Sequence, residues 1–357
     1  MRILIFISLL SVLVSCGGTD CCVPPPKQQK DLIKGADISF LPELEEDGIK
    51  FYNASGIEKD MLDILKESGV NTIRLRLWHT PESGQSTLSE VKALSQQIKA
   101  KGMNVWLSVH YSDTWADPGH QVKPAAWNAA SFTDLADSVY KYTKKVMMEI
   151  DPDIIQIGNE INGGFLLPNG STSNVPNFIT LLNEGIRAVR EVSSNTKIMV
   201  HVAGFDVAGW FYQQLKTNSV DYDLIGLSYY PIWHGKDMTV IRSIIDGLGT
   251  ANGKEVVIAE TAYPFTLGWE DDTNNIVGEA GQLVSGYSAT PDGQRKFLLK
   301  IRELVNDSNH GIGFCYWGAE WVAFEGEVMN GSSWENQALF DFNNKAVPAL
   351  EAFEDEE

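Results

Sequence analysis

The sequence predicts an α/β fold, a single (β/α)8 barrel of the TIM type. Eight short apolar runs alternate with stretches in which apolar residues recur at helical spacing, from about residue 34 to residue 353. This alternation leaves no segment large enough for another domain. A doubly wound open sheet is the competing fold, but no G-x-G-x-x-G motif follows the first apolar run, and eight units favour closure.

The apolar runs are rich in Ile, Val and Leu, as expected for parallel strands that are buried on both faces. We expect strands at residues 34–39, 71–78, 104–111, 154–160, 197–204, 224–231, 255–260 and 311–318. The helices between them have recognisable start signals. Ser55 and Glu58 have the spacing of a capping box, and Thr290 before Pro291 is typical of an N-cap followed by the first helical residue. Helices are expected at about 55–68, 88–101, 131–148, 175–192, 209–216, 240–248, 290–305 and 348–353, with loops at 40–43 and 265–290.

The N-terminal residues have the pattern of an export signal. Arg2 precedes an apolar run that ends at Cys16, so residues 1–16 are interpreted as a signal peptide that resembles those of bacterial lipoproteins. A plain signal peptide with an incidental cysteine is the alternative. The Pro-rich residues 17–34 are interpreted as a flexible linker, and residues 35–357 as the (β/α)8 domain. We therefore expect an exported monomer, lipid-anchored at the bacterial outer membrane and exposed at the cell surface, with Cys315 as a small core residue.

Composition excludes some classes of partner. The formal net charge is −19, whereas binding to nucleic acid requires a basic face. The same charge disfavours an anionic polysaccharide and is compatible with a neutral glycan. The sequence contains neither an H-E-x-x-H zinc motif nor a G-x-S-x-G nucleophile motif, so metallopeptidase and serine esterase chemistry lack their signatures.

Two of the predicted strands end in glutamate. Glu160 follows the apolar run 154–157, and Glu260 follows the run 256–259. A carboxylate at the end of a buried strand is costly unless it is neutralised, paired or used. Each glutamate alone could cap a helix or pair with an arginine. Two at the mouth of one barrel match retaining glycosidases, in which an acid and a nucleophile lie about 5–5.5 Å apart.

The other strand ends are also polar or aromatic. Carbohydrate sites need this mixture, since aromatic faces bind the apolar face of a sugar ring and polar groups bind its hydroxyls. Taken singly, a core histidine or a strand tryptophan is more often structural than functional. The candidates for substrate binding are Asp37, Arg74, Arg76, His110, Asp113, Trp115, Asn159, His201, Tyr230 and Trp317. Trp233 and Trp321 on the same loops are expected to extend the groove.

Four segments resemble a known family. They are HYSDTWADPGHQ at residues 110–121, GNE at 158–160, AETAYP at 259–264 and SSWENQALFD at 332–341. They are similar to the endo-β-1,4-galactanases of glycoside hydrolase family fifty-three. The resemblance implies retaining hydrolysis of internal β-1,4 links in galactan or type I arabinogalactan, the side chains of pectin, with galacto-oligosaccharides as products.

The resemblance also implies roles for individual residues. Glu160 would be the acid/base and Glu260 the nucleophile. Asn159 would bind the sugar 2-hydroxyl, and Trp317 would form a platform under the sugar. Arg74 or Arg76, together with His110 and Tyr230, would orient Glu260 and keep it ionised.

A structural calcium ion is a further implication, because bacterial members often bind one between the last two loops. Asp271, Asp272, Asn274 and Glu335 are the candidate ligands, although Glu335 stands where an aspartate is expected. A solvated acidic loop is the alternative interpretation. The chemistry itself is expected to need no cofactor.

Two other functions remain open at this point. The first is a related retaining barrel glycosidase that acts on mannan or glucan, which the 110–121 segment disfavours. The second is a non-catalytic glycan-binding lipoprotein, which would have no need for both carboxyl groups.

Overall fold

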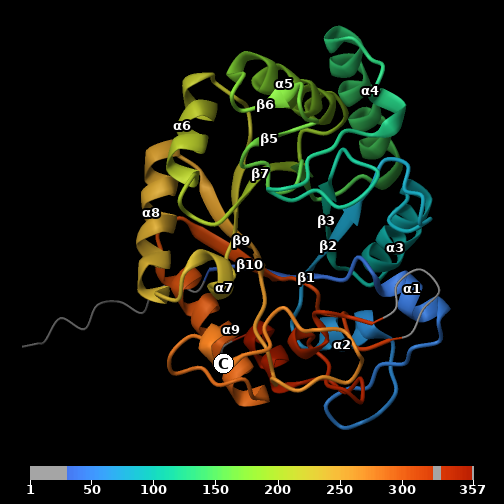
Figure 1. Cartoon of the computed structure of the whole chain (residues 1–357), viewed down its shortest axis with the longest axis vertical. Coiled ribbons are helices and arrows are strands. Elements are labelled where there is room, and N and C mark those ends of the chain that lie inside the picture. Colours follow the sequence, from blue (N-terminus) through green and yellow to red (C-terminus); the bar gives the residue numbers. More distant parts are fainter. Residues whose placement is uncertain (1–29, 325–330, 356–357) are drawn as a thin grey trace, which may run out of the picture. The chain divides into compact units, whose positions relative to one another are not determined.

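Parallel strands close into a barrel in the computed structural model, which describes residues 30–324 and 331–355 (Figure 1). Within these residues the barrel order is β1-β10-β9-β8-β7-β4-β3-β2. The predicted (β/α)8 barrel is confirmed. Its strands are β1 (Ile33–Asp37), β2 (Thr72–Leu77), β3 (Asn104–Val109), β4 (Ile154–Ile157), β7 (Lys197–Ala203), β8 (Leu224–Ser228), β9 (Glu255–Thr261) and β10 (Gly311–Tyr316).

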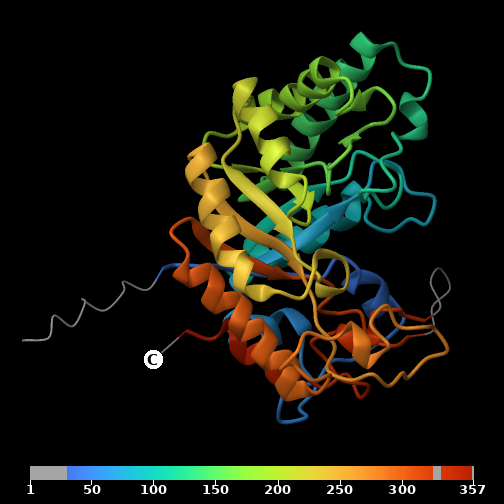
Figure 2. The ribbon, with the colours of Figure 1, turned by 60° about the vertical axis from the view of Figure 1, so that its left-hand side comes forward.

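Helices follow the strands and cover the outside of the barrel, as the yellow and orange helices show in Figure 2. The side chains of Thr87, Ser131 and Thr290 cap three of them by accepting backbone N–H groups of the first turn. The Thr290 cap was predicted. The longer helices are α2 (Met61–Glu67), α3 (Leu88–Ala100), α4 (Phe132–Ile150), α5 (Val175–Val192), α6 (Ala208–Thr217), α8 (Ile241–Asn252) and α9 (Pro291–Asp307).

Two local predictions were wrong. Residues 41–46 form helix α1 rather than a loop, because Leu41 and Leu44 bury one face of this turn. The capping box at Ser55 does not form: α2 begins at Met61, and Asp60 caps it by accepting the Asp63 N–H. Short elements also interrupt the expected loops, namely β5 (Gly164–Phe165), β6 (Gly170–Ser171) and α7 (Pro231–His234). The helix expected at residues 348–353 is present as the 3-10 helix η5 (Pro348–Phe353).

The first strand begins one residue earlier than expected, at Ile33 rather than at residue 34. Ile33 and Lys34 were assigned to the linker, but both belong to β1. Lys34 is buried, its N–H donates to the Asn71 side chain, and its ammonium group pairs with Asp355 at 2.8 Å. The predicted signal peptide, Cys16 and linker residues 17–29 lie outside the described residues. Among the described helices, none is long and apolar enough to span a membrane.

The interior of the barrel is filled by inward-facing strand residues. Trp106, Met199, Val257, Ala259 and Cys315 belong to this cluster, and all are fully buried. Strand side chains alternate between the two faces, so the intervening residues pack against the surrounding helices. Cys315 is the small core residue that the sequence predicts.

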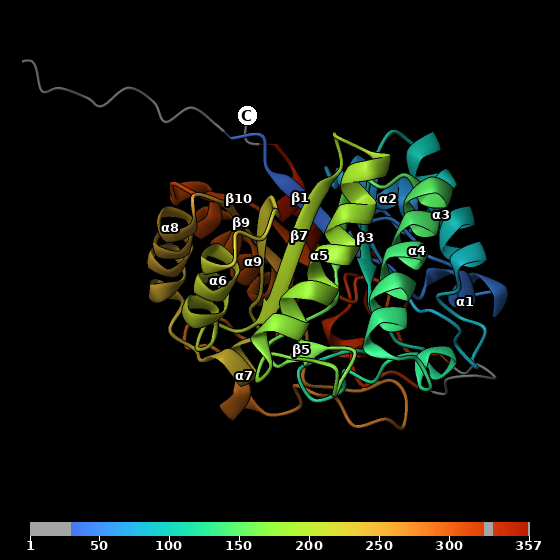
Figure 3. The same ribbon diagram turned by 90° about the horizontal axis from the view of Figure 1, so that it is seen from above.

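The elements that follow β4 and β8 lie at one end of the barrel. In Figure 3, α7 and β5 both lie along the same edge of the molecule, beyond the carboxyl ends of the strands. Because functional residues of such barrels gather at this end, the candidate site is sought there.

Candidate active site

A pocket of about 610 Å³ opens at the carboxyl ends of the strands. Most of the predicted site residues line it, although they come from almost every strand of the barrel. Those lining it are Asp37, Arg74, Arg76, His110, Trp115, Asn159, Glu160, Tyr230, Glu260 and Trp317. The structure therefore brings together residues that are up to 280 positions apart in the chain.

A sharp turn after β4 presents Glu160 to this pocket. Gly158 has φ +80°, and a β-carbon there would lie 2.5 Å from the Ile161 side chain. Glu160 itself has φ 46°, which is uncommon for a residue other than glycine. Such backbone strain tends to occur at functional sites, where the surrounding structure holds it in place.

A bulge in β9 directs Glu260 into the pocket. The register of β9 against β8 shifts by one residue after Ile258, so that Ser228 pairs with Glu260. Val257 and Ala259 face the barrel interior, and regular alternation would place Glu260 on the opposite face with Ile258. The extra residue re-aims the side chain, as bulges commonly do beside active sites.

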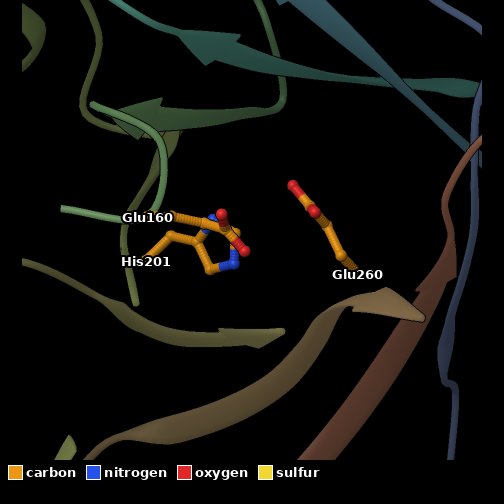
Figure 4. A group of neighbouring side chains, drawn as sticks. All are labelled: Glu160, His201 and Glu260. Carbon is orange, nitrogen blue, oxygen red and sulfur yellow. The ribbon is translucent and has the colours of Figure 1, made fainter. Parts of the chain in front are cut away.

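The two glutamates face each other. Figure 4 shows Glu160 beside His201, with Glu260 opposite them. One carboxyl oxygen of each glutamate and one ring nitrogen of His201 lie within 4.8 Å of one another. This separation is near that of the carboxyl pair in a retaining glycosidase. Burial and the nearby Glu260 charge raise the pKa of Glu160 to about 8, so Glu160 carries a proton at neutral pH.

Glu260 is held in a different environment. Its Oε1 accepts a hydrogen bond from Arg74 at 2.7 Å, and its Oε2 accepts one from the Tyr230 hydroxyl at 3.0 Å. Burial raises the pKa of Glu260, but the Arg74 charge and both hydrogen bonds act in the opposite direction. Of the two carboxyl groups, Glu260 is therefore the one stabilised as an anion.

A chain of hydrogen bonds leads to Glu160 from beneath the pocket. The Gln156 amide lies 3.0 Å from His201 Nδ1, and His201 Nε2 lies 2.9 Å from the Ser228 hydroxyl. Ser228 in turn donates to Glu160 Oε1 at 2.5 Å.

His201 was predicted to contact substrate, and the structure corrects this. The side chain is fully buried beneath Glu160 and does not line the pocket. Burial lowers its pKa well below the usual value, so it stays neutral. Ser228 and Gln156 were not singled out in the sequence, because a serine or glutamine inside a strand carries no recognisable signal.

Asn159 is fixed from two sides. Its Oδ1 accepts hydrogen bonds from Arg74 at 2.7 Å and Gln156 at 2.9 Å, and its Nδ2 donates to the Ala116 carbonyl at 2.8 Å. The Gln121 amide also donates to the Asn159 carbonyl at 2.7 Å. Asn159 thus lines the pocket in a single defined orientation.

Arg76 and His110 line the pocket without contacting Glu260. The Arg76 guanidinium lies over two indole rings, 4.4 Å from the Trp78 ring centroid and 4.0 Å from the Trp115 ring centroid. His110 Nδ1 accepts hydrogen bonds from the Trp78 indole and the Ala116 N–H, and burial lowers its pKa. Of the residues expected to hold Glu260, Arg74 and Tyr230 are the ones that do.

Asp113 also differs from the prediction. Its carboxylate accepts the N–H groups of Thr80 at 2.9 Å and Ala125 at 2.8 Å, and it lies 3.6 Å from His79. It does not line the pocket. Asp113 therefore ties neighbouring loops together, which explains a polar residue in this segment without contact to substrate.

Aromatic side chains form a continuous rim around the pocket. Neighbouring ring centroids lie between 4.6 and 6.1 Å apart from Trp115 through Trp317 and Trp334 to Tyr230 and Trp233. Trp233 and Trp321 were expected there. Trp334, Ser333 and His234 were not, because they occur in loops whose path depends on the tertiary fold.

Glu320 is a buried acid that the sequence analysis missed. Its Oε1 accepts the Phe40 N–H at 2.8 Å and so joins the loop after β10 to the loop after β1. Burial and the neighbouring Asp37 raise the pKa of Glu320 to about 8. A neutral Glu320 avoids a second negative charge beside Asp37.

The predicted calcium ligands do not gather around a common point. Glu335 is buried and accepts the N–H groups of Glu270 at 2.8 Å and Asp271 at 3.1 Å. Asp271 accepts the N–H groups of Thr273 and Ser332, both at 2.7 Å, while Asp272 and Asn274 are exposed. Among the described residues, Asp271, Asp272 and Glu335 do not bring ligand oxygens within 4.8 Å of one another, so these residues do not form the kind of cluster that calcium, with its six to eight oxygens, requires. The two carboxylates close the loop directly.

The fold and the site define a class of protein. A barrel that holds an acid and a stabilised carboxylate opposite each other, inside an aromatic-lined pocket, is a glycoside hydrolase. Residues 33–353 match the family described as "Glycosyl hydrolase family 53". This chain therefore belongs to glycosyl hydrolase family 53.

Curated relatives and a solved structure agree with this family. The "Arabinogalactan endo-beta-1,4-galactanase" of Cellvibrio japonicus is 36% identical, over 88% of this chain and 89% of that protein. The "Endo-beta-1,4-galactanase" of Bacillus subtilis is 32% identical, over 91% of this chain and 86% of that protein. The solved "Ignisphaera aggregans GH53 catalytic domain" has a TM-score of 0.87 at 40% identity, over 92% of this chain and 97% of that chain.

The loop closed by Glu335 gives a stability prediction. Glu335→Ala removes the acceptor of two backbone N–H groups, and we expect the free energy of unfolding to fall by about 1–3 kcal/mol. Denaturant unfolding of both proteins, with and without a calcium chelator, measures this. The difference should be equal in both conditions. A chelator that destabilises the wild type and removes the difference would mean that a bound cation closes the loop.

Proposed function

We propose that this chain hydrolyses internal β-1,4-galactosidic bonds of galactan and type I arabinogalactan by double displacement. One arrangement carries the mechanism: Glu160 and Glu260 have carboxyl oxygens within 4.8 Å of each other, yet burial and the Glu260 charge raise the pKa of Glu160 to about 8, while Glu260 is paired with Arg74. An acid and a nucleophile at this separation are what a retaining hydrolysis requires. This pair requires no cofactor.

In the first step the Glu260 carboxylate attacks the anomeric carbon, and the Glu160 carboxyl donates its proton to the departing glycosidic oxygen. The product is a galactosyl ester of Glu260. In the second step Glu160, now ionised, removes a proton from water, and the water oxygen displaces Glu260 from the anomeric carbon. Both steps invert this carbon, so the β configuration is retained.

Neighbouring residues support these steps. Arg74 and Tyr230 hold Glu260 in place and balance its charge as the ester forms and breaks. Asn159, with Oδ1 fixed by Arg74, presents its amide to the sugar 2-hydroxyl, a contact that strengthens in the transition state. Trp317, which lines the pocket, would support the apolar face of the sugar.

The substrate assignment rests on the family and on what its curated members are described as cleaving. A related glycosidase for mannan or glucan is the alternative. Structural neighbours described as β-1,4-mannanases share only 13–15% identity with this chain, so they support the barrel fold and not the substrate. A binding protein without catalysis would not need Glu160 and Glu260 in distinct protonation states.

The first prediction concerns the nucleophile. With linear β-1,4-galactan, the wild type should release reducing sugars rapidly, and Glu260→Gln should release none because an amide cannot form the ester. Glu255→Gln, an exposed residue at the opposite end of β9, is the matched control and should behave as wild type. Mannan and glucan are tested in parallel. Activity on one of these alone would overturn the substrate, and galactan binding without hydrolysis would overturn the enzyme function.

The second prediction concerns pH. Glu160 is the acid and its pKa is raised to about 8, so kcat/KM for galactan should be maintained at neutral pH and fall as pH rises through about 8. Ser228 donates to the carboxylate and thereby lowers this pKa, so Ser228→Ala should move the alkaline limb to higher pH. An alkaline limb at the same pH in Ser228→Ala as in the wild type would contradict this assignment. So would a wild-type kcat/KM that already falls near pH 5 as the pH is raised.

We also propose that the protein is exported and anchored through a lipid on Cys16, as the signal-like residues 1–16 suggest. In bacteria expressing the full chain, labelled fatty acid should be incorporated into the wild type and not into Cys16→Ser. Cys21→Ser is the matched control, since this cysteine follows the expected cleavage point. Labelling that persists in Cys16→Ser, or no labelling in the wild type, would exclude the anchor.

A further inference from the structure

His234, at the end of α7, lines the pocket and has a defined hydrogen-bonding state. Its Nδ1 accepts the backbone N–H of Tyr230 at 3.0 Å. A backbone N–H can only donate, so Nδ1 carries no proton in this arrangement and the neutral ring is protonated at Nε2. The ring therefore offers one N–H donor.

Two neighbours hold the ring in this position. Gly204 follows β7 with φ +69°, and a β-carbon on it would lie 2.7 Å from Cδ2 and 3.2 Å from Nε2 of His234. The absence of a side chain at this position is what makes room for the imidazole. On the other side the Tyr230 ring lies 6.1 Å away, centroid to centroid.

The His234 ring remains neutral at pH values near 7. Partial burial lowers the pKa of His234 to about 4, although the charge of Asp206 acts in the opposite direction. The group is consequently a fixed donor rather than a charge that could bind an anionic ligand. A neutral sugar hydroxyl is the matching acceptor.

His234 belongs to the Glu160 side of the pocket. It packs on Gly204 just after β7, the strand that pairs with β4, and the turn after β4 carries Glu160. The acid of a retaining glycosidase protonates the leaving oxygen, so this side faces the sugar that departs.

We propose that His234 binds the sugar on the leaving-group side of the cleaved bond, by donating a hydrogen bond from Nε2 to a hydroxyl of that sugar. Its neighbour Trp233 lines the same part of the pocket and is 54% exposed, so it supplies an apolar surface for the same sugar. This inference rests on the proposed hydrolase function and adds a specificity residue to it.

The test compares two substrates. A β-1,4-galactotetraose places sugars on both sides of the bond, whereas 4-nitrophenyl β-galactobioside has an activated aryl group in place of the departing sugar. For His234→Ala we expect kcat/KM to fall about tenfold with the tetraose, the effect of one lost hydrogen bond. With the aryl substrate it should change less than twofold. His310→Ala, a half-buried histidine at the amino end of β10, is the matched control.

A second measurement uses the same site in reverse. When galactobiose is added as acceptor to the galactosyl enzyme, it must occupy the leaving-group side, so His234→Ala should form about tenfold less transfer product relative to hydrolysis. Equal losses with both substrates, or no loss with either, would overturn the proposal.

The outcome is separable from that of the proposed function. If the wild type cleaves another β-linked glycan instead of galactan, the substrate assignment fails, and His234 is judged by the same comparison with that glycan and its aryl glycoside. If the wild type cleaves the aryl substrate alone and His234→Ala leaves transfer to galactobiose unchanged, the role of His234 fails while the hydrolase chemistry stands.

Discussion

The pairing of Arg74 with two carboxylates is the interaction on which the site depends. One Nη atom lies 2.6 Å from Asp37 and the other 2.7 Å from Glu260, and all three side chains are almost fully buried. Isolated burial of any one of these charges would cost several kcal/mol, so each is tolerated because the others are present. Although burial lowers the pKa of Arg74, the charges of Glu260 and Asp37 raise it above its ordinary value, which secures the cation.

This arrangement also separates the roles of two chemically identical side chains. Glu260 accepts a hydrogen bond from the Arg74 cation. Glu160 accepts one from the neutral Ser228 hydroxyl and lies near the negative charge of Glu260, which raises its pKa. The proton therefore resides on Glu160. Glu320 lies near Asp37, and burial and the Asp37 charge raise its pKa to about 8, so no second negative charge stands beside Asp37.

Local sequence signals account for much of the barrel and for the identity of the two glutamates. Apolar runs, the Thr290 cap and the long helix at residues 175–192 follow from residue type alone, and the structure has them. The capping box at Ser55 failed because Asp60, five residues later, offers an equally good cap where packing places the helix. Roles for Asp113 and His201 were misjudged because a polar residue near a strand end looks the same whether it faces the pocket or lies behind it.

The sequence by itself determined the order of strands and helices, the acidic balance and the presence of glutamates where two strands end. Hydrophobic periodicity and the residues that begin or end helices and strands are local properties, so they can be recognised in the sequence alone. The tertiary structure alone decided which carboxyl group holds the proton and where His234 donates. Protonation depends on burial and on charges brought from distant strands, and the direction of Glu260 depends on a one-residue bulge against its neighbour. Such properties arise only when separate segments meet in space.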